Sequence, residues 1–197
     1  MEVYLLTLIA YLLGSVPTGY IIGSWAGIDV RKAGSGNVGA TNVARVVGKR
    51  QGIFTLIADA AKGFVPVVIA LKLGSTPVTV AVVGIAAFLG HLYPIFLRFR
   101  GGKGVATALG VFLGLAPWAA GILTVIFAAM VLMTRVVSLS SMVTAASAPL
   151  VLWLLRYSPV LIPMSVFIAA MIILRHRENI RRLLSGTEPT LSSPSSR

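Results

Sequence analysis

The chain has 197 residues, of which 57% are hydrophobic and only 11% are charged, and its mean hydropathy is +0.93. Soluble domains carry roughly 25% charged residues, so this composition excludes an ordinary soluble protein. The formal net charge of +12 favours anionic headgroups and anionic substrates over nucleic acid, because so apolar a chain places its basic residues at a membrane surface.

Long apolar runs follow one another along the chain and predict an all-α membrane protein. The alternating pattern of a membrane barrel is absent, so helices are the spanning element. A spanning helix needs about 20 apolar residues, and we predict seven transmembrane helices, with five as the alternative. The predicted ranges are 3–26, 53–72, 77–97, 104–116, 118–134, 137–155 and 159–174.

The first apolar run starts almost at Met1 without a basic segment and is longer than a signal-peptide core, so we predict a retained helix. Residues 1–185 are expected to form a single membrane domain. The stretch 186–197, rich in Ser, Thr and Pro, is predicted to be a disordered cytoplasmic tail. Cysteine is absent, which excludes disulfides and a thiolate nucleophile.

With seven spans, the basic residues collect on one side of the membrane. That side holds Arg31, Lys32, Arg45, Lys49, Arg50, Arg98, Arg100, Lys103, Arg135, Arg175, Arg177, Arg181, Arg182 and Arg197. The opposite side has only Lys72 and Arg156. Because short basic loops stay in the cytoplasm, we predict the N-terminus outside and the C-terminus cytoplasmic.

Glycines recur every four residues at Gly19, Gly23 and Gly27, and again at Gly110 and Gly114. This spacing lets helix backbones approach closely in lipid. We therefore predict helix packing at these positions.

The segment from Gly34 to Arg45, GSGNVGATNVAR, is a long polar interruption between apolar runs. It matches the GxGxxG spacing, but flanking helices replace the strand that a dinucleotide site needs. Glycine backbone can instead turn tightly and point N–H groups at phosphate, and Arg45 adds a guanidinium fork if a short helix starts near Asn42. We predict a phosphate site at Gly34, Ser35, Gly36, Asn37, Gly39, Thr41 and Asn42. A flexible solvated loop is the alternative.

A second segment, HLYPIFLRFRGGKGVAT, starts at His91 and surrounds Lys103 with glycines at Gly101, Gly102 and Gly104. The spacing of a nucleotide-binding P-loop is missing, so we interpret Lys103 as a cation among backbone donors in a second anion site. Arg98 and Arg100 are expected to anchor the topology. His91 lacks partners at zinc spacing and is expected to pack or to donate a hydrogen bond.

A third polar segment, RHRENIRRLLS from Arg175, is predicted to continue the last span as a helix. One helical face carries His176, Asn179, Ile180 and Leu183, and the other carries Arg177, Glu178, Arg181 and Arg182. The inward polar pair, His176 and Asn179, either satisfies buried groups or reaches into the site. The outward arginines are expected among anionic lipid headgroups.

Asp59 and Lys62 lie three residues apart within the second predicted span. An ionisable residue in a membrane is a functional candidate by default, yet a carboxylate and an ammonium at this spacing neutralise each other. We predict a structural ion pair.

The motifs GSGNVGATN, GGKGVAT and RHRENIRRLL, in this order beside apolar helices, resemble the bacterial PlsY family of acyl-phosphate:glycerol-3-phosphate acyltransferases. The resemblance implies a seven-helix enzyme of the bacterial inner membrane with a cytoplasmic active site. It implies transfer of a fatty acyl group from acyl phosphate to the 1-hydroxyl of glycerol 3-phosphate, giving lysophosphatidic acid and phosphate, in the first acylation of phospholipid synthesis. It implies no cofactor and no metal, and as partners the two substrates, membrane lipids and the enzyme that forms the acyl phosphate.

The resemblance also implies roles for individual residues. Ser35, Arg45 and Lys103 are expected to hold substrate phosphate, assisted by Asn37, Thr41 and the glycine-rich backbone. His176 and Asn179 are expected to position the glycerol. An acyl phosphate is already activated, so no protein nucleophile is needed, and with only five acidic residues in the chain the hypothesis is that a substrate phosphate takes the hydroxyl proton. A phosphate or phospholipid transporter and a noncatalytic scaffold are the alternatives, although no internal repeat supports a transporter.

Overall fold

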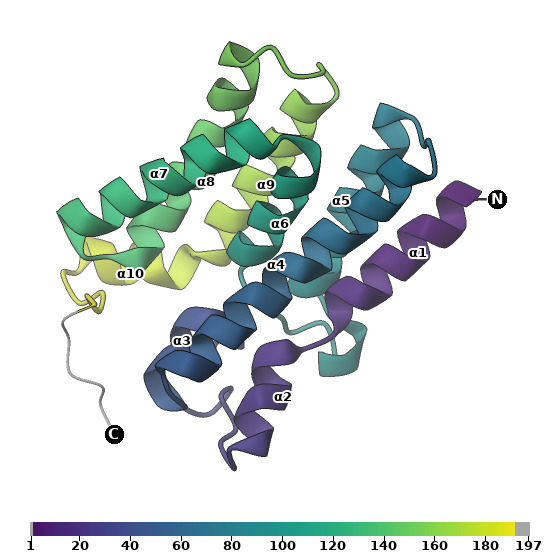
Figure 1. Ribbon diagram of the computed structural model, residues 1–197. Helices are drawn as coiled ribbons and strands as arrows, with labels where there is room; N and C mark the ends of the chain where they lie inside the picture. The colour runs from purple at the N-terminus through teal and green to yellow at the C-terminus, as the bar shows by residue number, and fades with distance from the viewer. Residues whose placement is uncertain (1, 192–197) are drawn as a thin grey trace. The chain divides into compact units, whose positions relative to one another are not determined.

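The computed structural model describes residues 2–191, apart from the side chain of Glu2. Every regular element in this part of the chain is a helix, which confirms the all-α prediction (Figure 1). The chain divides into two compact units, with the boundary after Gly114. The single domain over 1–185 stays a prediction, as does disorder of 186–197, of which 192–197 lie outside the described residues.

The first unit comprises α1 (Glu2–Ser15), α2 (Thr18–Trp25), α3 (Ala40–Val46), α4 (Lys49–Lys72), α5 (Pro77–Leu92), the 3₁₀ helix η1 (Ile95–Leu97) and most of α6 (Val105–Leu115). Helix α4 begins before the predicted residue 53, and α6 lies within the predicted range 104–116. The short helix α3 covers Asn42 and Arg45, as the interpretation of that segment requires.

The first predicted span is interrupted between α1 and α2, at Val16 and Pro17. Proline has no N–H and its ring clashes with the preceding turn, so it ends a helix and suits the start of the next one. The prediction of one continuous helix over 3–26 is wrong at this point. The interruption leaves the Val16 carbonyl outside a helical ladder, and Lys62 Nζ donates to it at 2.6 Å.

Helices α1 and α5 lie side by side in the first unit (Figure 1). Glycine permits their close approach: a Cβ on Gly14 would collide with the carbonyl oxygen of Ala87, and one on Gly90 with that of Tyr11. Tyr11 also donates its hydroxyl to the carbonyl of Tyr93 at 2.7 Å. The bare glycine surfaces therefore join the first span directly to α5.

The predicted glycine contacts are partly confirmed between helices. A Cβ on Gly110 would collide with the Ala60 carbonyl, and Gly114 faces Val67, so α6 packs closely on α4. Gly19 and Gly23 pack instead against the loop that follows α2. Gly27 has a φ of +72° and no neighbour for a Cβ within 4 Å, so it serves a turn rather than a helix contact.

The second unit contains α7 (Pro117–Thr134), α8 (Val137–Leu154), α9 (Leu161–Arg175) and α10 (Arg177–Leu184). Helix α8 packs against both α7 and α9. Helix α9 agrees with the last predicted span, 159–174, but its predicted continuation from Arg175 is interrupted at His176, between α9 and α10. Beyond α10, Glu188 and Leu191 hydrogen-bond to other parts of this unit.

Five helical segments of the described chain are long and apolar enough to cross a membrane: Val3–Trp25, Lys49–Lys72, Pro77–Leu97, Pro117–Thr134 and Val137–Leu154. Two further apolar helices, Val105–Leu115 and Leu161–Arg175, are shorter. Large apolar side chains remain exposed on these helices, among them Phe54, Trp118 and Leu132. Such a surface is suited to lipid rather than to water. The protein is thus helical and membrane-embedded.

Candidate active site

Asn42 organises the first glycine-rich loop from within. Its side chain is 2% exposed. Its Oδ1 accepts from the Ser35 N–H at 2.8 Å, and its Nδ2 donates to the carbonyls of Val30, Ala33 and Asn37 at 3.0, 3.1 and 2.9 Å. Gly34 has a φ of +59°, and a Cβ there would collide with Asn42 Oδ1. The loop can close around this amide only with glycine at that position.

Several groups predicted to face an anion are engaged inside the loop. Besides the Ser35 N–H, the Gly39 N–H donates to Asn37 Oδ1 at 2.8 Å and the Gly36 N–H to the Ala33 carbonyl at 3.0 Å. The Asn42 amide is fully used as well. The prediction that Asn42 is a direct donor to substrate is therefore corrected. Its amide stabilises the loop backbone that carries the other donors.

Among the described residues, the groups of the first loop and α3 left to meet a ligand are the side chains of Ser35, Thr41 and Arg45 and the Asn37 Nδ2, because only Asn37 Oδ1 is engaged. Ser35 and Thr41 are exposed, and Arg45 is half-buried in the last turn of α3. Within the described residues the Arg45 guanidinium makes no hydrogen bond or ion pair. A guanidinium can bind a phosphate through two parallel N–H bonds. This arrangement suits an anionic ligand.

Arg31, at the base of the same loop, is engaged elsewhere. Its Nε and one terminal nitrogen donate to the two oxygens of Asp29, each at 2.9 Å, and its guanidinium lies 4.4 Å from the centroid of the Tyr20 ring. The hydrogen bond from Arg31 lowers the pKa of Asp29 to about 2. Arg31 therefore has a structural role at the start of the loop, through Asp29 and Tyr20.

The second glycine-rich loop joins η1 to α6 and carries Lys103. The Gly101 and Gly102 N–H groups donate to the carbonyls of Leu92 and His91, each at 3.1 Å. Arg98 and Phe99 have φ values of 52° and 62°, a left-handed conformation that is uncommon outside glycine. The backbone here is bent back tightly onto the end of α5.

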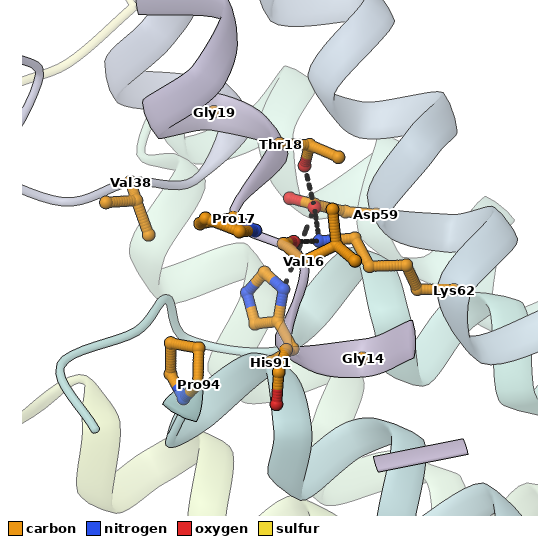
Figure 2. Close-up of a pocket in the computed structure, with 11 residues that line it drawn as sticks. Gly14, Val16, Pro17, Thr18, Gly19, Val38, Asp59, Lys62, His91 and Pro94 are labelled. Atoms are coloured by element: carbon orange, nitrogen blue, oxygen red, sulfur yellow. Dashed lines mark hydrogen bonds and ion pairs between the residues drawn. The ribbon is translucent and has the colours of Figure 1, made fainter. Parts of the chain in front are cut away.

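The two loops lie next to each other in the first unit. Leu97 of η1 shares a buried apolar cluster with Val30, Val38 and Val43 from the first loop and α3. Val38 and Pro94 also line a common pocket (Figure 2). The structure thus brings the Gly34–Arg45 segment and the Lys103 segment to one place, although they are separated by two long helices in the sequence.

The buried ion pair is confirmed beneath these loops. Lys62 Nζ lies 2.6 Å from Asp59 Oδ1, and the two side chains are 9% and 3% exposed. His91 Nδ1 lies 3.7 Å from the same carboxylate oxygen. Figure 2 shows Asp59, Lys62 and His91 converging near Val16 and Pro17.

In the second unit, His176 and Asn179 are 2% and 6% exposed, whereas Arg177, Glu178 and Arg181 are exposed. The helical spacing predicted this division. His176 Nδ1 lies 2.8 Å from the Ile172 carbonyl. Since a carbonyl only accepts, Nδ1 carries a proton, and in the neutral ring the lone pair is on Nε2.

Glu188 lies in the stretch 186–197 that the sequence predicts to be a disordered tail, and its contacts were not expected. Glu188 Oε1 accepts from Asn179 Nδ2 at 2.5 Å and from Ser138 Oγ at 2.6 Å, and Oε2 from Arg182 Nε at 2.7 Å. Burial raises its pKa, but these three hydrogen bonds outweigh that effect and hold the pKa below its ordinary value. The available signal in the sequence was that Glu188 is one of only five acidic residues in the chain.

Among the described residues, no three His, Asp or Glu side chains gather to hold a metal ion. The three acids Asp29, Asp59 and Glu188 each have a cationic partner. The donors of both loops are hydroxyls, amides and cations, which suit an anion rather than a cation.

These features define an integral membrane protein of apolar helices with two adjoining loops rich in donors. A family model described as glycerol-3-phosphate acyltransferase matches residues 4–186, and the chain belongs to this family. The glycerol-3-phosphate acyltransferase of Geotalea daltonii is 54% identical over 179 residues, covering 91% of this chain and 92% of that protein. The corresponding protein of Geobacter sulfurreducens is 52% identical over 184 residues, covering 93% and 95%.

Solved structures agree with this assignment. A crystal structure of PlsY, an integral membrane glycerol 3-phosphate acyltransferase, in its glycerol 3-phosphate form has a TM-score of 0.95 and 43% identity, covering 98% of this chain and 96% of that one. The lysophosphatidic acid form has a TM-score of 0.91 and 43% identity, covering 96% and 95%. The resemblance seen in the three motifs is therefore confirmed at the level of the family.

Proposed function

We propose that this glycerol-3-phosphate acyltransferase uses an acyl phosphate as donor and acylates the 1-hydroxyl of glycerol 3-phosphate. The observation that supports it is that the Gly34–Arg45 segment, with Arg45 in the last turn of α3, and the segment leading from His91 to Lys103 share a buried apolar cluster through Val38, Val43 and Leu97. Both substrates carry a phosphate. Two cations on neighbouring loops can hold two phosphates side by side, and such fixation supplies effective molarity worth on the order of 7–11 kcal/mol.

The reaction needs little covalent help from the protein. The glycerol hydroxyl oxygen attacks the acyl carbonyl carbon, and the bond from that carbon to the phosphate oxygen then breaks. The hydroxyl proton passes to a phosphate oxygen, and inorganic phosphate leaves. Cationic donors such as Lys103 stabilise the negative charge that develops on the carbonyl and leaving-group oxygens.

The environment of the acids supports a substrate phosphate as the base. Asp29, Asp59 and Glu188 are held by Arg31, Lys62 and Arg182. Glu178 is exposed on the outer face of α10. A general base must be free to take the proton it removes, and Asp29, Asp59 and Glu188 are each already engaged by a cation.

His176 and Asn179 are proposed to orient the glycerol. Both are buried polar residues on one face of the α9–α10 junction. The hydrogen bond of Nδ1 to the Ile172 carbonyl fixes the imidazole, and Glu188 fixes the Asn179 amide. Fixed donors and acceptors act better than mobile ones because no reorganisation is needed during the reaction.

We further propose seven spans, with the N-terminus outside and the active site at the cytoplasmic face of the bacterial inner membrane. The five long spans together with the two shorter apolar helices give this number, and the distribution of Lys and Arg favours the orientation. Because the chain has no cysteine, Lys32→Cys is a unique label site. It should react with a membrane-impermeant maleimide only in inverted vesicles. Labelling in intact cells would show that the orientation is opposite to the proposed one.

The donor is tested with purified protein in detergent. Palmitoyl phosphate and palmitoyl-CoA are each offered with radiolabelled glycerol 3-phosphate, and labelled lysophosphatidic acid is measured. We expect product from acyl phosphate alone, together with one inorganic phosphate for each acyl group transferred. Product from acyl-CoA at an equal rate, or none from either donor, would refute the proposal.

A further inference from the structure

A buried carboxylate below the active loops has more partners than an ion pair needs. Asp59 Oδ1 accepts hydrogen bonds from Lys62 Nζ at 2.6 Å and from the Thr18 hydroxyl at 2.5 Å, and His91 Nδ1 lies 3.7 Å away, at ion-pair distance for a protonated imidazole. These groups come from α4, from the start of α2 and from the end of α5, and they meet at the wall of one pocket (Figure 2). Lys62 alone would neutralise the carboxylate. The other two partners require a different explanation.

The Thr18 contact leads to the first loop. Thr18 is the first residue of α2, directly after the break at Pro17. The next residue, Gly19, packs so closely on the loop that a Cβ would collide with the Val38 carbonyl. Val38 belongs to the Gly34–Arg45 segment. A displacement of the α2 start therefore passes directly to the backbone of that loop.

The His91 contact leads to the second loop. The carbonyl of His91 accepts from the Gly102 N–H at 3.1 Å. A Cβ on Gly102 would collide with the His91 ring, so the loop backbone lies flat against the imidazole. Lys103 is the next residue. The His91 side chain thus packs directly against the backbone of the loop that carries Lys103.

We propose that Asp59 is a positioning residue, whose contacts with Thr18 and His91 hold the two active-site loops at a fixed separation. This inference rests on the proposed function. Asp59 acts through Thr18 and His91. Its carboxylate oxygen lies where α2, α4 and α5 meet, and it limits how far the Gly34–Arg45 segment and the loop that carries Lys103 can move apart. Two phosphates held at the wrong separation place hydroxyl and carbonyl out of reach, since an error near 1 Å costs about 100-fold in rate.

The break at Val16 and Pro17 completes this arrangement. Lys62 donates to the Val16 carbonyl as well as to Asp59, so one ion pair fixes both sides of the interruption in the first span. The Val16 carbonyl also accepts from the Thr18 N–H at 3.0 Å, and a carbonyl outside the helical ladder needs such partners inside a membrane. Lys62 therefore helps to satisfy the backbone at the interruption.

Thr18→Val tests the proposal because it removes one hydrogen bond to Asp59, keeps nearly the same shape, and leaves the buried charges balanced. Changing Asp59 itself leaves Lys62 uncompensated, which can prevent folding. Thr7→Val is the matched control: Thr7 lies in the same span and its hydroxyl only bonds the Val3 carbonyl. Thr18→Ser is the conservative variant that restores the hydroxyl.

Two readouts are measured for each variant. Spin labels on Lys32→Cys and Arg100→Cys, both exposed positions, report the distance between the loops. Steady-state kinetics report kcat and the KM for glycerol 3-phosphate. We expect Thr18→Val to shift or broaden the distance distribution and to lower kcat/KM by about tenfold, as for loss of a hydrogen bond to a charged group. Thr18→Ser and Thr7→Val should match the parent.

An unchanged distance distribution in Thr18→Val would overturn the proposal, as would equal defects in Thr18→Val and Thr18→Ser. The spin-label distance needs no turnover. If the parent protein fails to use acyl phosphate while Thr18→Val still shifts the loops, the proposed function fails and the positioning role stands.

Discussion

Asn42 Oδ1 accepts a hydrogen bond from the Ser35 N–H at 2.8 Å, so the end of the first loop is tied to its beginning by one buried amide. This relationship changes the role expected for Asn42. Asn42, which the sequence predicts to contact substrate, instead holds the loop backbone together. It thereby positions the exposed Ser35 hydroxyl.

Asn42→Ala should disrupt the first loop. The Val30 and Asn37 carbonyls and the Ser35 N–H lose their partner, whereas the Ala33 carbonyl keeps the Gly36 N–H, and each buried group left unsatisfied costs about 1–3 kcal/mol. We expect faster amide exchange over residues 30–42 and loss of most activity, measured by hydrogen–deuterium exchange and product formation. Asn42→Asp should be worse than Asn42→Ala, because its carboxylate would face carbonyl oxygens. Unchanged exchange in either variant would contradict the role as a brace.

Arg45→Ala should remove a phosphate ligand without affecting the fold. Loss of a charged donor to a developing anion costs roughly 100- to 1,000-fold in kcat, and Arg45 has no side-chain partner among the described residues whose loss would destabilise the protein. Arg50→Ala is the control, since Arg50 is exposed at the start of α4. Activity and melting temperature are measured together. Near-normal turnover in Arg45→Ala would remove Arg45 from the site.

Lys103→Ala should likewise abolish most turnover, measured as product formation. The physical reason is the loss of the cation that the second loop carries. Lys103→Arg restores the charge but not the point-like geometry, so we expect only partial recovery. A rate in Lys103→Ala within about twofold of the parent would be incompatible with stabilisation of developing charge by this residue.

Glu188 gives the second unit a sensitivity to acid. Its folded pKa is lowered below the ordinary value of 4.5, so its stabilising contribution is complete above about pH 4.5 and is lost as the pH falls through the folded value. Glu188→Gln should lower the melting temperature at pH 7 and flatten its dependence between pH 5 and pH 3. Glu178→Gln, on the exposed face of α10, is the matched control. Parallel curves for the parent and Glu188→Gln would show that the carboxylate adds no stability.

Gly110→Ala should destabilise the protein through helix packing. The new Cβ would collide with the Ala60 carbonyl, which is backbone and cannot turn away. The helices α4 and α6 must then separate. Gly121→Ala is a sharp control, because no atom lies within 4 Å of its Cβ and alanine favours a helix over glycine by about 1 kcal/mol. We expect the first variant to melt lower than the parent and the second to melt equal or higher, and a reversed order would refute the packing argument.

The amino-acid sequence by itself determined the class of fold. Apolar runs longer than about 20 residues leave helices as the stable way to satisfy the backbone in lipid. It also determined which polar residues at the α9–α10 junction face inward, since His176 and Asn179 were predicted on one face and both are buried. The Asp59–Lys62 pair was predictable because both residues lie on one face of one helix. Such features depend only on neighbours within one element.

Tertiary structure decided everything that joins distant segments. Whether an amide such as Asn42 faces a ligand or its own loop depends on which carbonyls the chain folds around it, and spacing carries no such information. The same holds for Glu188, whose partner Ser138 lies 50 residues away, and for Thr18, whose partner Asp59 lies 41 residues away. The sequence placed Glu188 in a tail and Thr18 inside one continuous first helix. Long-range contacts are made by packing and by closure of loops, and a local pattern records neither.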